Sequence, residues 1–138
     1  MSNDAKTRRI GYGLIGAGAF GRFCLDAYRS LEAVERIAVG DVDPVAARRA
    51  ATEAGIEACE SVEALLAREE IELVHVATPP WTHGEIAVKA LEAGKHVLCE
   101  KPLAITLDDA EAMLDAAKRN QRVLAVNLFA LAILAGGI

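Results

Sequence analysis

The chain has 138 residues, of which 53% are hydrophobic and 25% are charged, and its formal net charge is −5. This length and balance fit one globular domain with a sizeable core and exclude an intrinsically disordered chain. The acidic charge argues against nucleic acid as a partner, because no basic stripe is available to neutralise phosphates.

The segment 1–9 is a polar N-terminal tail whose two arginines precede a strand rather than a long apolar run. It lacks the pattern of a signal peptide, so we expect a cytoplasmic protein with no membrane partner. The three cysteines, Cys24, Cys59 and Cys99, lie far apart and match no metal-binding spacing. We expect reduced, mostly buried thiols and no metal site, with a catalytic cysteine as the alternative.

The first predicted strand, 10–15, runs directly into a glycine-rich loop, Gly16-x-Gly18-x-x-Gly21, which opens a helical pattern over 20–31. Gly16 allows a tight turn, Gly18 lets backbone approach a pyrophosphate, and Gly21 lets the helix pack closely on the sheet. The free N–H groups and positive dipole end of that helix suit two phosphates. The loop therefore predicts a dinucleotide-binding unit.

Asp41 ends the second predicted strand, 36–41, and follows Gly21 by 20 positions, as the dinucleotide fingerprint requires. A carboxylate there accepts hydrogen bonds from the adenosine ribose and repels a 2′-phosphate. The next residue is Val42, which cannot hold such a phosphate, so NAD is expected rather than NADP. The alternative is that Asp41 only caps a loop with Asp43-Pro44.

The remaining pattern alternates helices and strands. In the helix over 20–31, Phe23, Ala27 and Leu31 stand four residues apart and predict one apolar face. The elements expected after Asp41 are a helix from Pro44 to Gly55 capped by Asp43, a strand at 56–59, a helix at 61–68, a strand at 71–77, a helix from Thr82-His83 to Gly94, a strand at 96–99, a helix at 106–120 capped by Thr106, and a strand at 122–127.

Apolar strands separated by helices indicate a parallel sheet covered on both faces. Right-handed crossovers then predict an α/β fold with a doubly wound parallel sheet, the three-layer α/β/α Rossmann fold, over 10–127. Ligands of such sheets bind outside the carboxyl ends of the strands. At that edge the predicted strand 71–77 is followed by Thr78-Pro79-Pro80-Trp81 and His83, and the predicted strand 96–99 is followed by Glu100-Lys101-Pro102.

Each of these strand-end residues also has a simpler interpretation. Lys101 could be a surface lysine, His83 could only cap or pack, and Trp81 is expected to pack on the cofactor or the sheet rather than take part in chemistry. The Lys101–Pro102 bond is a candidate cis peptide, since X–Pro bonds alone reach the cis form at low cost.

Taken together, these motifs resemble the Gfo/Idh/MocA oxidoreductases, the family of glucose–fructose oxidoreductase and inositol dehydrogenase. The matching segments are Gly16-Ala17-Gly18-Ala19-Phe20-Gly21, Asp41-Val42-Asp43-Pro44, Ala77-Thr78-Pro79-Pro80-Trp81-Thr82-His83 and Gly94-Lys95-His96-Val97-Leu98-Cys99-Glu100-Lys101-Pro102. The resemblance covers about 10–127, the family's N-terminal half. It implies hydride transfer between a nicotinamide cofactor and a secondary alcohol, often of a sugar or cyclitol.

The expected cofactor contacts are the following residues: Gly16, Gly18, Ala19, Phe20, Gly21, Asp41, Thr78, Pro79, His83, Glu100 and Lys101. The resemblance also implies that Lys101 is catalytic and points at the substrate hydroxyl near the nicotinamide, where it polarises a carbonyl or relays a proton. Glu100 and Pro102 would fix the turn that aims it.

The sequence departs from the family pattern after Asn127. The family has a second, substrate-binding domain that supplies an Asp and a His, and none follows here. Instead 128–138 is an apolar C-terminal tail, and from Val123 to Ala135 only Asn127 is polar, a run too short to span a bilayer. The alternatives are that it packs on the sheet, that it packs on another copy, or that it records a truncation or frameshift; we expect self-association into a homo-oligomer.

Three functions remain open. The first is the NAD-binding domain of an oxidoreductase, which would act on a small polyol only if a substrate domain is supplied. The second is a non-catalytic NAD-binding module, a sensor or partner subunit, which has no use for Lys101. The third is a degenerate fragment that binds nothing tightly.

Overall fold

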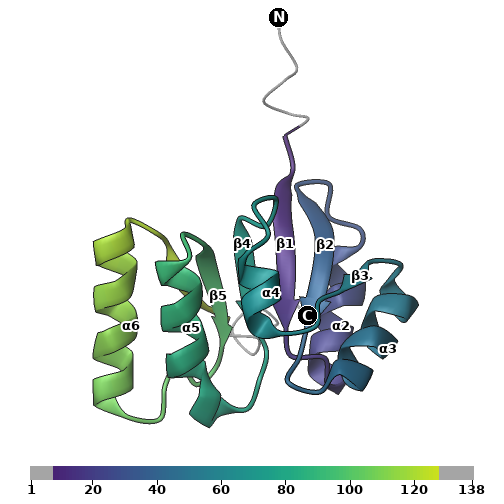
Figure 1. Cartoon of the computed structure of the whole chain (residues 1–138). Helices are drawn as coiled ribbons and strands as arrows, with labels where there is room; N and C mark the ends of the chain where they lie inside the picture. The colour runs from purple at the N-terminus through teal and green to yellow at the C-terminus, as the bar shows by residue number, and fades with distance from the viewer. Residues whose placement is uncertain (1–7, 128–138) are drawn as a thin grey trace, which may run out of the picture.

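The computed structural model of the chain describes residues 8–127 (Figure 1). The apolar segment 128–138, and the predicted N-terminal tail apart from Arg8 and Arg9, lie outside this range. In chain order the elements are β1 (Ile10–Ile15), α2 (Ala19–Tyr28), β2 (Val34–Gly40), α3 (Pro44–Ala54), β3 (Glu57–Ala58), α4 (Val62–Leu66), β4 (Leu73–Val76), η1 (Pro80–Thr82), α5 (His83–Glu92), β5 (His96–Glu100), α6 (Leu107–Asn120) and β6 (Leu124–Asn127).

The six strands form one sheet in the order β3-β2-β1-β4-β5-β6, and every pair is parallel. This is the doubly wound order of dinucleotide-binding folds, so the predicted fold class is confirmed. The order reverses between β1 and β4, which creates a crevice at the carboxyl ends of these strands. Those ends meet at the lower edge of the molecule in Figure 1, away from the N-terminal segment.

Two clusters of buried side chains lie on opposite faces of the sheet. One packs α2 and α3 on β1 and β2 and includes Leu14 and Leu25. The other lies beneath α4, α5 and α6 and includes Ile15, Leu65 and Met113. Consecutive residues of a strand point to opposite faces, so Leu14 and Ile15 belong to different clusters. The three-layer arrangement is therefore built on nearly continuous apolar strands.

Helix ends follow the predicted capping residues. The side chains of Asp43, Ser61 and Thr106 each accept a hydrogen bond of 3.0 Å from a backbone N–H two or three residues later. Gly55 and Gly94 follow the last turns of α3 and α5 with φ values of 71° and 83°, which favour glycine. Local sequence therefore sets these boundaries.

The predicted apolar face of the first helix was wrong. Phe23, Ala27 and Leu31 are all exposed, and the helix ends at Tyr28. The reason is Gly21, which approaches β1 so closely that a Cβ atom on it would lie 1.9 Å from the Gly16 carbonyl oxygen. This approach turns the face of α2 carrying Gly21, Cys24 and Leu25 toward the sheet.

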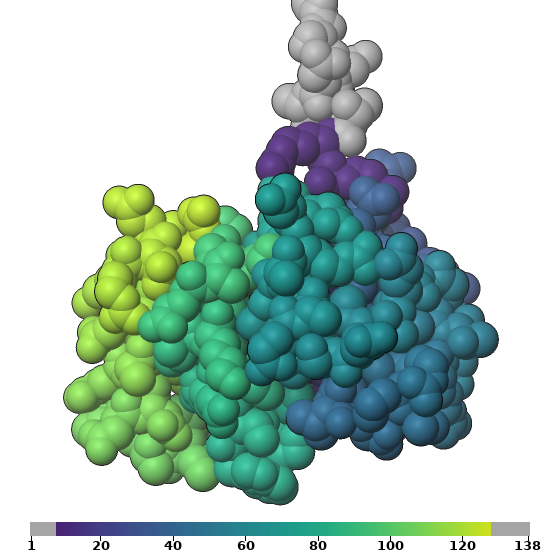
Figure 2. Space-filling view, viewed as in Figure 1, coloured from purple at the N-terminus to yellow at the C-terminus, as the bar shows by residue number. Residues whose placement is uncertain are grey.

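Within residues 8–127, the helices are all too short or too polar to cross a lipid bilayer. In the space-filling view the helices that cover the near face form a continuous surface (Figure 2). At its lower edge the loop after β2 lies beside the loop after β4, and both line the crevice described next.

Candidate functional site

The glycine loop has the geometry of a phosphate-binding turn. Gly16 has φ of 112°, and a Cβ there would lie 2.3 Å from the Ala77 carbonyl oxygen, so no other residue fits. At Gly18 a Cβ would meet nothing within 4 Å, so the loop faces open space at this point. Gly18 is the N-cap of α2 and supplies no capping side chain. The first N–H groups of α2 are therefore available to an anion.

Asp41 stands directly beside this loop. Its Oδ2 accepts a hydrogen bond of 2.7 Å from the Ala17 N–H, and its Oδ1 accepts one of 2.8 Å from the Asp43 N–H. The carboxylate therefore joins the glycine loop to the turn before α3. Each carboxylate oxygen keeps a further lone pair for a ribose hydroxyl.

A groove of about 440 Å³ runs between the loops after β1, β2 and β4. Its walls are mostly apolar, and Val42 and Trp81 stand on its rim with 90% and 69% of their surfaces exposed. Of the predicted contacts, five line this groove together: Gly16, Gly18, Asp41, Thr78 and Pro79. Ala19 and Phe20 lie at the exposed start of α2, next to the loop. Val62, Thr82 and Ile86 also line the groove and were not among the predicted cofactor contacts.

The loop after β4 is held by its own hydroxyl groups. The Thr82 hydroxyl donates to the Pro79 carbonyl oxygen at 2.6 Å, so the Thr78 hydroxyl must donate to Thr82 Oγ1, also at 2.6 Å. This arrangement fixes the groove wall that Thr78 and Pro79 form.

His83 lies beneath that loop rather than in the groove. It is 1% exposed, and its ring nitrogens lie 2.8 Å from two carbonyl oxygens, Nδ1 from that of Pro102 and Nε2 from that of Thr78. The Lys101–Pro102 peptide bond is cis, as predicted. Lys101 is exposed at the carboxyl end of β5, and within residues 8–127 its ammonium makes no hydrogen bond or ion pair.

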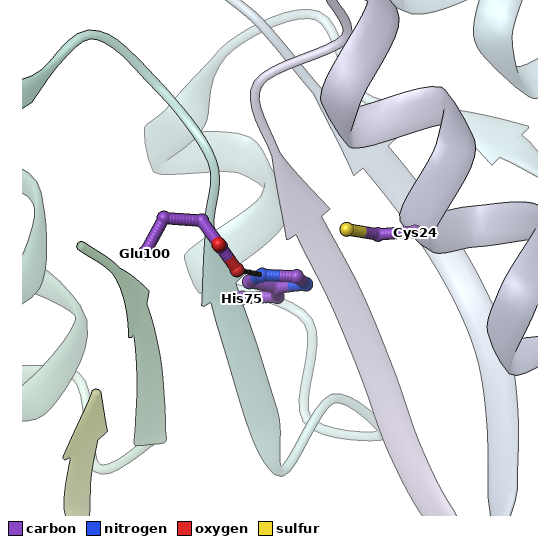
Figure 3. Close-up of side chains that lie close together, drawn as sticks. All are labelled: Cys24, His75 and Glu100. Carbon is purple, nitrogen blue, oxygen red and sulfur yellow. Dashed lines mark hydrogen bonds and ion pairs between the residues drawn. The ribbon is translucent and has the colours of Figure 1, made fainter. Parts of the chain in front are cut away.

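Glu100 is 8% exposed and belongs to a buried polar chain that crosses four strands. Tyr12 Oη lies 2.6 Å from His75 Nδ1. His75 Nε2 lies 2.5 Å from Glu100 Oε2 (Figure 3). Asn127 Nδ2 donates to the same Glu100 oxygen at 2.8 Å. His75 was not predicted, although it is the one polar residue in the apolar run 73–77, which was the available sign.

Burial favours the neutral forms of Tyr12 and His75 in this hydrogen-bonded network. Desolvation lowers the pKa of His75, against the opposing effect of Glu100, and it raises the pKa of Tyr12 well above its ordinary value. Tyr12 therefore keeps its proton and donates to Nδ1, while Nε2–H donates to Glu100. The hydrogen bonds therefore all point the same way: Tyr12 donates to His75, and His75 donates to Glu100.

Cys24 brings a thiol to the same place, on the other side of His75 from Glu100 (Figure 3). One ligand atom from each of these three residues lies within 4.8 Å of the others. Burial raises the pKa of the Cys24 thiol to about 11, and both ring nitrogens of His75 are engaged with Tyr12 and Glu100. His75 and Glu100 are thus hydrogen-bonded to each other beside the buried Cys24 thiol, rather than arranged as metal ligands.

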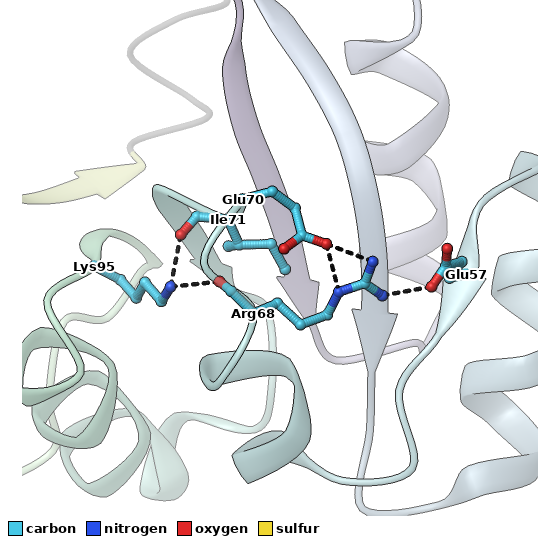
Figure 4. A network of polar contacts seen from close by, with 5 residues as sticks. All are labelled: Glu57, Arg68, Glu70, Ile71 and Lys95. Carbon is cyan, nitrogen blue, oxygen red and sulfur yellow. Dashed lines mark hydrogen bonds and ion pairs between the residues drawn. The ribbon is translucent and has the colours of Figure 1, made fainter.

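The opposite, amino edge of the sheet carries another polar network (Figure 4). Lys95 is 6% exposed, and its Nζ donates to the carbonyl oxygens of Arg68 and Ile71 at 2.6 and 2.7 Å. Arg68 pairs with Glu57 and Glu70, each at 2.6 Å, and these carboxylates raise its pKa. Burial lowers the pKa of Lys95. Lys95 and Arg68 are therefore both bonded within the protein, Lys95 to backbone carbonyls and Arg68 to carboxylates.

With the crevice and its loop in view, residues 10–128 match the family model of the Gfo/Idh/MocA oxidoreductases, described as an oxidoreductase family with an NAD-binding Rossmann fold. The chain belongs to this family. It is thus an NAD(P)-binding Rossmann domain of the Gfo/Idh/MocA oxidoreductases.

Curated relatives agree with this assignment. The chain is 39% identical over 116 residues to a dTDP-3,4-didehydro-2,6-dideoxy-alpha-D-glucose 3-reductase of Saccharopolyspora spinosa, covering 83% of this chain and 35% of that protein. It is 36% identical over 113 residues to D-apiose dehydrogenase of Paraburkholderia graminis, covering 81% and 30%. Such relatives favour a dehydrogenase domain over a non-catalytic binding module. The chain spans about a third of the length of the curated relatives it matches.

Solved structures show the same fold. GenD2 from gentamicin A biosynthesis, in complex with NAD, superposes with a TM-score of 0.82 at 31% identity, over 87% of this chain and 34% of that one. KijD10, a 3-ketoreductase from Actinomadura kijaniata with NADP and TDP-benzene, gives 0.83 at 32% identity, over 87% and 37%. Because one neighbour holds NAD and the other NADP, this likeness does not separate the two cofactors.

Proposed function

We propose that this chain binds NAD in preference to NADP and serves hydride transfer between the nicotinamide and a secondary alcohol of a sugar, cyclitol or similar polyol. The observation that carries this proposal is Asp41, whose carboxylate is bonded to the glycine loop and lines the groove. A 2′-phosphate on the adenosine ribose would meet this charge. Two like unit charges 4 Å apart near a protein surface repel by about 4 kcal/mol.

Acidic residues beyond Asp41 support the preference for NAD. An adjoining hollow of about 320 Å³ shares Asp41 and Val42 with the groove and is also lined by Glu60, Glu63 and Glu85. The hollow's one cationic lining residue among residues 8–127 is Lys89, which lies 3.4 Å from Glu63 and 3.3 Å from Glu85. The lining of this hollow, beside the proposed ribose position, is therefore negatively charged. Its one cation, Lys89, is already paired with Glu63 and Glu85 and is not left to hold a phosphate.

Lys101 is the residue proposed to act on the substrate. Bound nicotinamide supplies the carbon that accepts or donates hydride. The ammonium of Lys101 then holds a proton near the reacting oxygen, polarises a carbonyl, or takes part in the proton relay of alcohol oxidation. Glu100, buried and bonded by His75 and Asn127, anchors the strand end that presents Lys101.

Calorimetric titration of the chain with NAD⁺ and then NADP⁺ tests the cofactor part. We expect saturable NAD⁺ binding, weaker NADP⁺ binding, and a loss of about tenfold or more in NAD⁺ affinity for Asp41→Ala, since a charged hydrogen-bond acceptor contributes about 1.5–3 kcal/mol. Asp115→Ala, an exposed acid on α6, is the matched control and should bind as the parent chain does.

The outcomes separate the three functions. Equal affinity for both dinucleotides would remove the proposed preference. A folded chain that binds neither would favour the degenerate fragment. The chemical step needs a separate variant: Lys101→Ala should lose turnover once a substrate domain is supplied, whereas a non-catalytic module would be unaffected by it.

We also propose residence in the cytoplasm and self-association as a homo-oligomer, from the composition and from the apolar run 128–138. Sedimentation of the full chain and of a variant ending at Asn127 tests the second point. Loss of the larger species in the shortened variant is expected.

A further inference from the structure

The hydrogen bonds of the three histidines assign their protons. The sequence contains three histidines, and the structure describes all of them, His75, His83 and His96. His75 accepts from Tyr12 at Nδ1 and donates to Glu100 from Nε2, so it carries one ring proton. His96 Nδ1 accepts from the Val123 backbone N–H at 3.0 Å, so its Nδ1 is bare as well. Both rings are neutral imidazoles in this arrangement.

His83 differs from both. Its two ring nitrogens each lie 2.8 Å from a backbone carbonyl oxygen, that of Pro102 at Nδ1 and that of Thr78 at Nε2. A carbonyl oxygen can only accept, whereas a neutral imidazole has one N–H and one lone pair. In the neutral ring, one lone pair would therefore face a carbonyl lone pair at 2.8 Å. Two good hydrogen bonds require a proton on both nitrogens.

We propose that His83 is a doubly protonated imidazolium that bridges the wall of the nucleotide groove to the turn carrying Lys101. Thr78 belongs to the groove-lining loop after β4, and Pro102 follows Lys101 in the cis turn after β5. Burial at 1% exposure opposes a positive charge here, and the two carbonyl oxygens offset that cost by accepting a hydrogen bond from each ring nitrogen. His83 is thus a positioning residue: it acts through the two loops that it joins.

The bridge explains why a buried histidine stands where the sequence expects a cofactor contact. Thr78 and Lys101 come from neighbouring strands, and in the described part of the chain His83 bonds to both of their loops at once. A one-donor residue could hold only one of these loops. This positioning role rests on the proposed function, whereas the protonation state of His83 does not.

The protonation state can be read from the intact chain. In a long-range ¹H–¹⁵N correlation spectrum of ¹⁵N-histidine-labelled chain at pH 7, we expect one imidazole with protons on both nitrogens and two with a proton on one. The variants His75→Gln and His96→Gln assign the signals by elimination, so the assignment needs no change at His83. A folded chain with three singly protonated rings would overturn the proposal.

Calorimetry tests the positioning role separately. His83→Gln keeps an amide donor but no cation, and we expect it to weaken NAD⁺ binding by about tenfold, while His96→Gln changes it less than twofold. Unchanged binding by folded His83→Gln would reject the positioning role even if the imidazolium is found. If the parent chain binds no NAD⁺, the proposed function fails. The spectrum still shows whether His83 carries a proton on both ring nitrogens.

Discussion

The two edges of the parallel sheet differ in how completely their polar groups are bonded. At the amino edge, Lys95 is buried against two carbonyl oxygens and Arg68 is held by two carboxylates (Figure 4). At the carboxyl edge, α2 begins at Gly18 without a capping side chain. There, too, the ammonium of Lys101 makes no hydrogen bond or ion pair within residues 8–127.

This difference shows where the fold keeps polar groups available for a ligand. Groups bonded within the protein stabilise it, while groups left to solvent at the crevice can bind an anion or a substrate at no cost in internal bonds. The amino edge is therefore expected to govern stability and the carboxyl edge to govern binding. Substitutions at matched positions can break or sharpen this division.

The largest effect is expected inside the glycine loop. Gly21→Ala places a Cβ 1.9 Å from the Gly16 carbonyl oxygen and should cost about 3 kcal/mol or more of stability, as severe overpacking does. Gly18→Ala meets nothing within 4 Å, so it should change stability by less than about 1 kcal/mol yet weaken NAD⁺ binding. Urea unfolding and calorimetry measure the two effects. Equal destabilisation by both substitutions would contradict the assigned roles.

At the amino edge, Lys95→Met should remove about 2 kcal/mol of stability, because two buried carbonyl groups lose a charged donor. Its affinity for NAD⁺ should match that of the parent chain, since Lys95 lies at the far end of the sheet. Lys118→Met, an exposed lysine on α6, serves as the control. A loss of NAD⁺ affinity without a loss of stability would reverse the division between the edges.

Acid should lower the folding stability of the protein through His75, which lies in the buried hydrogen-bonded network. Desolvation holds the pKa of His75 in the folded protein below 6.5, its ordinary value in an unfolded chain. At a pH between the folded and the unfolded pKa of His75, the unfolded state therefore binds more protons than the folded state. Stability is then complete above about pH 6.5 and falls as the pH is lowered. Urea midpoints at pH 7 and pH 5.5 should differ less in His75→Gln than in the parent chain. In His96→Gln, the difference between the two urea midpoints should be as large as in the parent chain.

The smallest effect is expected at an exposed ion pair. Arg119 Nη2 lies 2.8 Å from Glu92 Oε1, but more than half of each side chain is exposed. Arg119→Gln should therefore change stability by about 0.5 kcal/mol or less, and added salt should remove even that difference. A larger loss in thermal unfolding would show that exposed charges near the amino edge matter as much as Lys95 does.

Features set by neighbours along the chain could be predicted from the sequence. The caps Asp43, Ser61 and Thr106 act on N–H groups two or three residues away, and the Lys101–Pro102 peptide is cis because proline permits it. The parallel sheet follows from the alternation of apolar strands and helices. The clustering of Gly16, Asp41 and the Thr78 loop follows from the rule that strand ends meet at one edge.

Features set by contacts across the sheet could not be predicted. The buried face of α2 depends on how closely Gly21 approaches β1, and helical spacing alone favoured Phe23, Ala27 and Leu31 instead. The bonds of His75 depend on the register of several strands. The two carbonyl partners of His83 come from turns 24 positions apart, Thr78 and Pro102, and no local pattern pairs them.

The position of Trp81 gives the groove its own optical probe. It is the sole tryptophan of the sequence, and it stands on the groove's rim with 69% of its surface exposed. Reduced nicotinamide dinucleotide absorbs light in the range where tryptophan emits, so a molecule in the groove would draw excitation energy from this one indole. The tryptophan fluorescence of the unlabelled chain would then follow occupancy in real time, with no second tryptophan to subtract.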